Sequence, residues 1–220
     1  MFAHFRSTIV VFINILLDGG FKYIAKALGT RIYSNKIAYG FSLDRPERFE
    51  ILECDKELEI RFCQKSDKIY FNRFLENRRL LDLNVNKCYV ALIKNDQPCF
   101  IQWLVMPSNN SSFFDLYGDI FPILNEDEAI LEGAYIPKTY RGYHIMQTGI
   151  SKILNLQENS NISKIFSFVD VNNIASIKGV SRCGFKPYIL RVIKWRFFKR
   201  NVFYKELTAS HLLRYSRSVE

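Results

Sequence analysis

The sequence predicts a mixed α/β (α+β) fold, in which a central sheet is flanked by helices. Short apolar or alternating segments, which are typical of strands, recur between longer segments with helical periodicity. Strands and helices are mixed along the chain, which places helices on the faces of a sheet. The chain has 220 residues, of which 48% are hydrophobic and 24% charged, enough for one domain with a sizeable core and an extra segment. Nineteen Phe and twelve Tyr argue against disorder.

Residues 1–35 are predicted to form an N-terminal amphipathic helical leader, and residues 36–220 the main domain. The apolar run Ile9–Leu17 (IVVFINILL) has about half the length that a membrane-spanning helix needs. The basic residues that follow it are Lys22, Lys26, Arg31 and Lys36. This pairing is compatible with a helix resting on an anionic membrane surface, and equally with packing on the domain or in a homodimer.

Strand and helix signals follow in order along the main domain. Strands are expected at Lys36–Leu43, Leu58–Phe62, Cys88–Lys94, Cys99–Met106, Ala129–Ile136, Lys164–Val169, Phe185–Phe197 and Val202–Leu207. Helices are expected at Ser66–Leu81, Tyr143–Leu156 and Asn173–Arg182. Ser66 is the expected N-cap of the first helix, while Pro107–Ser112 is predicted as a loop and Phe113–Leu124 as irregular structure. A helix between two strands requires a crossover, so Ala129–Ile136 and Lys164–Val169 are expected to be parallel in a mostly antiparallel sheet.

The net charge and the cysteine content limit the expected binding partners and the expected cellular compartment. A net charge of +9 attracts anions such as nucleotide cofactors, anionic lipid or acidic carrier proteins. No nucleic-acid-binding module is recognisable, so no nucleic acid partner is predicted. The five cysteines are odd in number and form no CxxC pair, and there are only three histidines. No disulfide framework and no metal site are therefore predicted, and a reducing, cytoplasmic location is expected.

The segment Ala129–Gln147 carries the first chemical motif. A predicted strand ends, a short turn containing Arg141 and Gly142 follows, and a helix begins. A helix N-terminus presents unpaired N–H groups and a partial positive charge, which suit a pyrophosphate. Gly142 would let a phosphate approach the backbone closely.

A second motif lies about 30 residues downstream. Asn173 is the expected cap of a helix that contains Ser176, and the helix is closed by Gly184-Phe185. With the first motif, this order resembles the GNAT family of N-acetyltransferases. Arg141–Met146 occupies the six places of that family's R/Q-x-x-G-x-G/A loop; His144 and Met146 stand where the family usually has Gly and Gly or Ala.

The resemblance implies a fold, a cofactor and a reaction. It implies a sheet whose two parallel strands splay at one end, acetyl-CoA or another acyl-CoA as cofactor without a metal, and acyl transfer to a small amine such as an amino sugar or amino acid. The residues implied to contact the cofactor are Ala134, Tyr135, Ile136, Arg141, Gly142, Tyr143, His144, Ile145, Met146, Asn173 and Ser176. Glu132 is the implied catalytic base. Val180 stands where many members carry a tyrosine acid, and Tyr188, Tyr143 or water are alternatives.

Two other functions remain alternatives. His144, Met146 and Val180 favour a non-catalytic binding module of the same fold. The basic charge and the apolar leader favour an enzyme similar to long-chain N-acyl amino acid synthases, which would take acyl chains from an acyl carrier protein. Lys26–Leu43 resembles the leader of GNAT-type proteins associated with cell-surface polysaccharide or lipid biosynthesis, which would place the protein at the inner face of the membrane. The basic stretch Arg191–Arg200 is interpreted as either a solvated sheet edge or a docking surface.

Overall fold

The computed structural model describes residues 21–45, 50–54, 56–71, 80, 85, 87–93 and 97–219. The apolar run Ile9–Leu17 and most of the helix predicted at Ser66–Leu81 lie outside the described residues. Contacts group the chain into two compact units. The smaller unit contains described residues 21–37 and Val192–Phe203, and the larger contains those of Ala38–Arg191 and Tyr204–Glu220.

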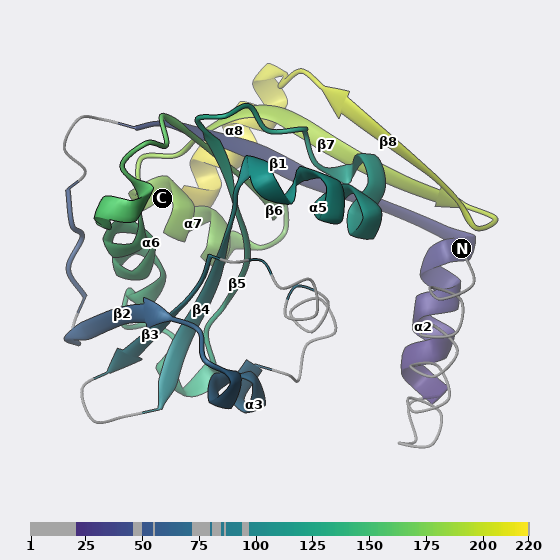
Figure 1. The fold of residues 1–220 in the computed structure, drawn as a ribbon. Helices are drawn as coiled ribbons and strands as arrows, with labels where there is room; N and C mark the ends of the chain where they lie inside the picture. Colours follow the sequence, from purple (N-terminus) through teal and green to yellow (C-terminus); the bar gives the residue numbers. More distant parts are fainter. Residues whose placement is uncertain are drawn as a thin grey trace. The chain divides into compact units, whose positions relative to one another are not determined.

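Eight strands form one sheet, in the order β2-β3-β4-β5-β6-β1-β7-β8 (Figure 1). Their bounds are β1 Tyr33–Asp44, β2 Leu58–Phe62, β3 Cys88–Ile93, β4 Pro98–Val105, β5 Glu128–Tyr135, β6 Lys164–Asp170, β7 Lys186–Arg196 and β8 Lys199–Lys205. Each corresponds to a strand expected from the sequence, with ends that differ by a few residues. The mixed α/β fold class is therefore confirmed.

The pairing directions follow the expectation. The pairs β2/β3, β3/β4, β4/β5 and β1/β6 are antiparallel, whereas β5 and β6 are parallel. The β5/β6 register begins at Glu128↔Lys164 and ends at Leu131↔Ser167, although both strands continue. Beyond that point β5 stays paired with β4 through Tyr135, and β6 stays paired with β1 through Asp170. The parallel strands therefore separate at their carboxyl ends, as expected.

The helices of the structure differ from the expected helices more than the strands differ from the expected strands. They are α2 Phe21–Ile32, α3 Lys68–Phe71, α5 Asn110–Tyr117, α6 Ile145–Asn155, α7 Ile174–Arg182 and α8 Ala209–Val219. Short 3₁₀ turns lie at η1 Lys65–Asp67, η2 Pro107–Asn109, η3 Gly118–Ile120, η4 Lys138–Tyr140 and η5 Gln157–Asn159. Ser66 lies inside η1 rather than capping a helix. Within the described residues, no helix has both the length and the apolarity needed to cross a bilayer.

The prediction of loop and irregular structure between Pro107 and Leu124 is wrong, because this segment contains η2, α5 and η3. Proline opens η2 at its first position, where its missing N–H is harmless. Phe113 of α5 then packs its ring 4.8 Å from that of Phe121, and both belong to a buried core cluster with Trp103 and Phe168. Burial of these aromatic rings in the tertiary structure stabilises the helix. Its polar Asn-Asn-Ser-Ser start gives no helix signal in the sequence.

The opposite face of the sheet is covered by α6. Its buried residues include Ile150, Ile153 and Leu154. Gly149 lets the helix approach β4 closely, since a Cβ there would lie 2.6 Å from Cε1 of Phe100. The two faces are thus packed by different elements, α5 with η3 on one and α6 on the other.

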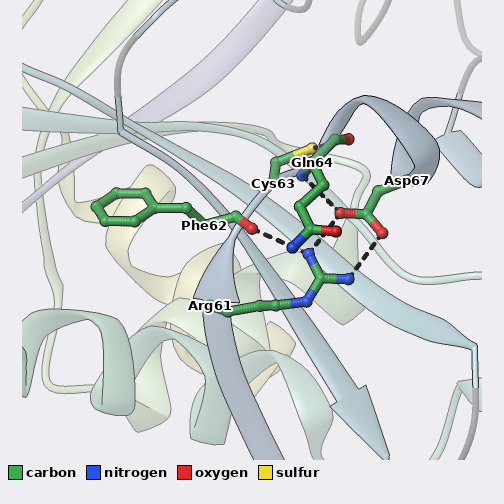
Figure 2. A network of polar contacts seen from close by, with 5 residues as sticks. All are labelled: Arg61, Phe62, Cys63, Gln64 and Asp67. Carbon is green, nitrogen blue, oxygen red and sulfur yellow. Dashed lines mark hydrogen bonds and ion pairs between the residues drawn. The ribbon is translucent and has the colours of Figure 1, made fainter.

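A buried ion pair fixes the end of β2 (Figure 2). The Arg61 Nη1 and Nη2 atoms donate to the two carboxylate oxygens of Asp67, at 2.6 and 2.9 Å. The Gln64 N–H also donates to Asp67, at 2.7 Å, and Arg61 donates to the Phe62 carbonyl. Burial raises the pKa of Asp67, but the hydrogen bonds from Arg61 and Gln64 outweigh it and hold the pKa below its ordinary value.

Candidate functional site

A β-bulge in β5 redirects the end of this strand. The register with β4 shifts between Ile101↔Tyr135 and Trp103↔Glu132, which leaves one extra residue on β5. Gly133 sits in this bulge with φ +69°, where a Cβ would lie 2.7 Å from Cε3 of Trp103. Only glycine accepts that conformation in that space. The bulge thereby turns the last residues of β5 away from β6.

A cleft of about 590 Å³ lies beside this strand end. It is lined by the end of β5, the loop containing η4, the N-terminus of α6, one side of α7 up to its last residue, and Phe100 of β4. Ten of the eleven residues implied as cofactor contacts line it: Ala134, Tyr135, Ile136, Arg141, Gly142, His144, Ile145, Met146, Asn173 and Ser176. Tyr143 is not among the lining residues, and its ring instead lies 5.4 Å from the Lys56 ammonium.

The N-terminus of α6 presents backbone donors to the cleft. The first helical hydrogen bond runs from the Thr148 N–H to the His144 carbonyl, so the amides of Ile145, Met146 and Gln147 precede the helical ladder. Apart from its two chain neighbours, no described residue has an atom within 4 Å of the position that a Cβ would take on Gly142, whose φ is +95°. The backbone here is open to the close approach of a ligand.

His144 occupies the N-cap position in the left-handed conformation, with φ 58°. Its side chain makes no capping hydrogen bond to the helix. A left-handed backbone favours glycine, which accounts for the residue type usual at this place in the family that the loop resembles. His144 therefore adopts a backbone conformation that glycine accepts more easily.

The second motif forms the facing wall of the cleft. Asn173 caps α7, and its Oδ1 accepts a hydrogen bond from the Ser176 N–H at 3.2 Å, which confirms the predicted cap. Met146 of α6 packs against Gly179 of α7, where an added Cβ would lie 2.6 Å from the methionine Sδ. The larger residue at position 146 is therefore accommodated by a glycine on the opposite helix.

The cleft carries positive charge. Arg141, Lys178 and Arg182 are among its lining residues, and none of the described lining residues is an Asp or Glu. The Arg141 Nε donates to the Ile136 carbonyl at 3.2 Å, and the Arg182 Nη1 donates to Gln147 at 3.3 Å. With two helix N-termini beside them, these cations make the cleft suited to an anionic ligand.

Sequence reasoning missed several of the lining residues. They are Phe100, Tyr140, Gln147, Ala175, Lys178, Gly179 and Arg182. The i,i+4 spacing of Lys178 and Arg182 on the helix capped by Asn173 was a usable signal, because such residues share one helix face. Phe100 had no local signal, since it lies on a strand far away in the sequence.

Glu132 lies outside the lining of the cleft. It is half-buried, and its carbonyl accepts a 2.7 Å hydrogen bond from the Gln102 side chain. By strand alternation its side chain shares the face of Ile130, which belongs to the core cluster with Phe168. The negative charge of Glu132 is close enough to Arg191 to favour the protonated, charged form of its guanidinium group.

Arg191 is only 9% exposed and packs against two aromatic rings. Its guanidinium carbon is 4.7 Å from the ring centroid of Phe121 and 4.4 Å from that of Phe168. Nη1 donates to the Ile120 carbonyl at 3.1 Å, whereas the buried Nε has no hydrogen-bond partner among the described residues. Burial lowers the pKa of Arg191. The interpretation of Arg191 as part of a solvated edge is wrong, because β7 lies between β1 and β8 in the sheet.

Two tyrosines lie near Arg191. Burial is the largest cause that raises the pKa of Tyr188 to about 12, and burial also raises the pKa of Tyr204. The Tyr204 hydroxyl donates to the Ile120 carbonyl at 2.6 Å. Both phenols hold their protons at neutral pH. Val180, in contrast, is buried in the core and has no proton to donate.

The eight-stranded sheet, the splayed parallel pair and the cleft at the splay define the fold of the GCN5-related N-acetyltransferases (GNAT). The chain superimposes on the GCN5-related N-acetyltransferase from Sphaerobacter thermophilus with a TM-score of 0.52 and 8% identity, covering 80% of this chain and 57% of that one. A protein from Drosophila matches with a TM-score of 0.53 and 11% identity, covering 81% and 57%.

The GCN5-related glucosamine N-acetyltransferase region of a fungal multi-domain β-N-acetylglucosaminidase matches with a TM-score of 0.53 and 14% identity. That match covers 82% of this chain and 23% of the fungal one. The chain thus spans less than two thirds of each of these neighbours. No protein-family model and no curated protein matches the sequence. Within the described part of the chain, no group of His, Cys, Asp or Glu is arranged to hold a metal ion.

Proposed function

We propose that this protein is an acyl-CoA-dependent N-acyltransferase that moves an acetyl group to a small amine, such as an amino sugar or an amino acid. The observation that carries the proposal is the cleft at the splayed ends of β5 and β6, with helix amides and three cations but no carboxylate in its lining. The names of the Sphaerobacter and fungal neighbours support the reaction class, and the fungal one supports an amino sugar as acceptor.

The residues of the cleft fit the cofactor. The open backbone over Gly142 and the amides of Ile145 and Met146 would hold the pyrophosphate. Arg141, Lys178 and Arg182 would balance the charge of the phosphates. The backbone of Ala134–Ile136 lies beyond the β5/β6 register and lines the cleft, and it would hydrogen-bond the extended arm of the cofactor.

Acyl-CoA, when bound, supplies an activated thioester. Glu132 lies one residue before the bulge, outside the cofactor cleft, and serves as the base that accepts the proton of the attacking amine. Tyr188 holds its proton at neutral pH and would be the acid that protonates the thiolate released when the C–S bond of the thioester breaks. Because Glu132 and Tyr188 both lie near Arg191, the acceptor amine approaches β5 from the side on which Arg191 lies.

Isothermal titration calorimetry with acetyl-CoA tests the cofactor site. Gly142→Asp should abolish measurable binding, because it adds bulk and negative charge where phosphate approaches. Lys178→Gln and Arg182→Gln should each weaken binding about tenfold or more, as expected for a charged hydrogen bond worth roughly 1.5–3 kcal/mol. Lys186→Gln is the matched control, since Lys186 is exposed at the start of β7 and does not line the cleft.

A free-thiol assay over a panel of amines tests the reaction. Glu132→Gln should leave the Kd for acetyl-CoA within about twofold of wild type and lower kcat by roughly 10²–10⁴. Absence of binding to acetyl-CoA and to longer acyl-CoAs would refute the proposal. Binding without thiol release from any amine would indicate a binding module, and activity restricted to long acyl chains would indicate the N-acyl amino acid synthase alternative.

A further inference from the structure

The turn between β7 and β8 exposes two phenylalanines in a conformation that disfavours them. Phe197 and Phe198 have φ values of 46° and 65° and are 81% and 55% exposed. Two successive positive φ values are the signature of a type I′ turn, which Asn-Gly adopts most easily. Neither folding nor burial accounts for Phe at these two places.

The turn is held by the helix of the same unit. The N–H of Phe197 donates to the carbonyl of Ile32, and the N–H of Phe198 to the carbonyl of Arg31, both at 2.9 Å. These carbonyls belong to the last turn of α2, which has no further helical donors for them. Figure 1 shows the β7–β8 turn beside this end of α2. The two rings are therefore displayed from an anchored turn.

Aromatic rings and arginines alternate around this turn. Arg31 and Arg200 each place their guanidinium carbon 5.9 Å from the Trp195 ring, and Arg196 lies 3.8 Å from the Tyr33 ring. Leu28, Ile32 and Tyr33 on α2 and the start of β1 are also exposed. Such a mixture is typical of protein surfaces that sit at a membrane–water interface.

In the described part of this unit, all the formally charged side chains are basic. The stretches 21–37 and 192–203 contain eight basic residues and no Asp or Glu. The basic residues are Lys22, Lys26, Arg31, Lys36, Lys194, Arg196, Lys199 and Arg200. An anionic partner is therefore the electrostatic complement of this unit.

We propose that the β7–β8 turn, with the adjoining end of α2, docks on the surface of an anionic lipid bilayer. Phe197 and Phe198 enter the boundary between headgroups and acyl chains, while the surrounding arginines and lysines contact lipid phosphates. The aliphatic Leu28 and Ile32 beside the rings favour lipid over a nucleic acid, because aliphatic side chains do not stack on bases. This surface shares no residue with the lining of the proposed acyl-CoA cleft, so neither proposal depends on the other.

Vesicle co-sedimentation of the full chain tests the proposal. We expect binding to phosphatidylcholine–phosphatidylserine vesicles, little binding to pure phosphatidylcholine, and weakening by salt. The double variant Phe197→Asn/Phe198→Gly should fold at least as well, since it installs the favoured turn, yet bind at least about tenfold more weakly. Lys199→Gln should weaken binding to anionic vesicles about fivefold.

Two controls sharpen the result. Phe114→Asn removes an exposed phenylalanine from α5 and should leave vesicle binding unchanged. Brominated lipids should quench tryptophan emission in wild type but not in Trp195→Tyr, because the only other tryptophan, Trp103, is buried in the core. Equal binding of wild type and the Asn-Gly variant would overturn the proposal. So would equal affinity for an oligonucleotide or an acidic protein, which would show a general polyanion site.

Discussion

His144 shows how a single backbone angle limits the residues that one position accepts. Because its φ is 58°, a β-branched side chain there is strained, whereas glycine is not. We expect the free energy of unfolding of His144→Val to be roughly 1–2 kcal/mol lower than that of His144→Gly. Urea denaturation of the two variants measures this difference. Both variants lack the imidazole, so any contact made by that ring cancels; equal stability would contradict the assigned conformation.

Met146 and Gly179 form a coupled pair across the cleft wall. Gly179→Ala places a methyl group 2.6 Å from the Met146 Sδ, which forces the methionine to move. The overpacking should cost about 1–3 kcal/mol and be offset by about 1 kcal/mol of helix propensity.

A double-mutant cycle with Met146→Ala isolates this contact. In the Met146→Ala background the clash is absent, so Gly179→Ala should stabilise the protein by about 1 kcal/mol. Thermal unfolding of the four proteins gives the coupling energy. Additive effects would show that the two side chains do not meet.

At the scale of elements, the Arg61–Asp67 pair ties β2 to η1. The pKa of Asp67 lies below its ordinary value of 3.8, so the pair stabilises the fold above that value. Its contribution is lost as the pH falls through the lower folded-state pKa. We expect Asp67→Asn to cost about 1–3 kcal/mol at neutral pH and to flatten the acid limb of the stability profile. Chemical denaturation between neutral pH and strongly acidic pH measures both effects, and the exposed Asp115→Asn is the control.

The whole larger unit depends on contacts between the two ends of its chain. The ring of Tyr215 of α8 packs edge-on at 6.0 Å from that of Tyr39 and tilted at 5.9 Å from that of Phe41 of β1. The Tyr215 hydroxyl donates to Ser181 of α7 at 3.0 Å. Tyr215→Ala should therefore lower the free energy of unfolding by about 2–3 kcal/mol, less than full burial would give because the ring is half-buried.

Tyr215→Phe keeps the ring and loses only the hydroxyl, so it should cost about 0.5–1.5 kcal/mol. Differential scanning calorimetry distinguishes the two variants. If both variants unfold at the same temperature, α8 is not packed on β1 as described.

Local patterns in the sequence determined most of the elements and most of the lining of the cleft beside β5. Alternation predicts β2 at Leu58–Phe62, and the Asn173 side chain both predicts and makes the cap of α7. The sequence of the Arg141–Met146 turn likewise predicts the backbone N–H donors at the N-terminus of α6. In each case the interactions that decide the structure lie within a few residues of one another, so they can be read along the chain.

Tertiary structure alone decided the features that depend on distant segments. The first strand, β1, lies between β6 and β7, and no local pattern encodes which strands it pairs with. The bulge at Gly133 needs Trp103 across the sheet, and α5 needs Phe121 and Phe168 to bury Phe113. Arg191 likewise has the sequence pattern of a solvated strand residue, but its side chain is buried against the rings of Phe121 and Phe168. Burial and partner choice arise from long-range packing, which composition and periodicity do not specify.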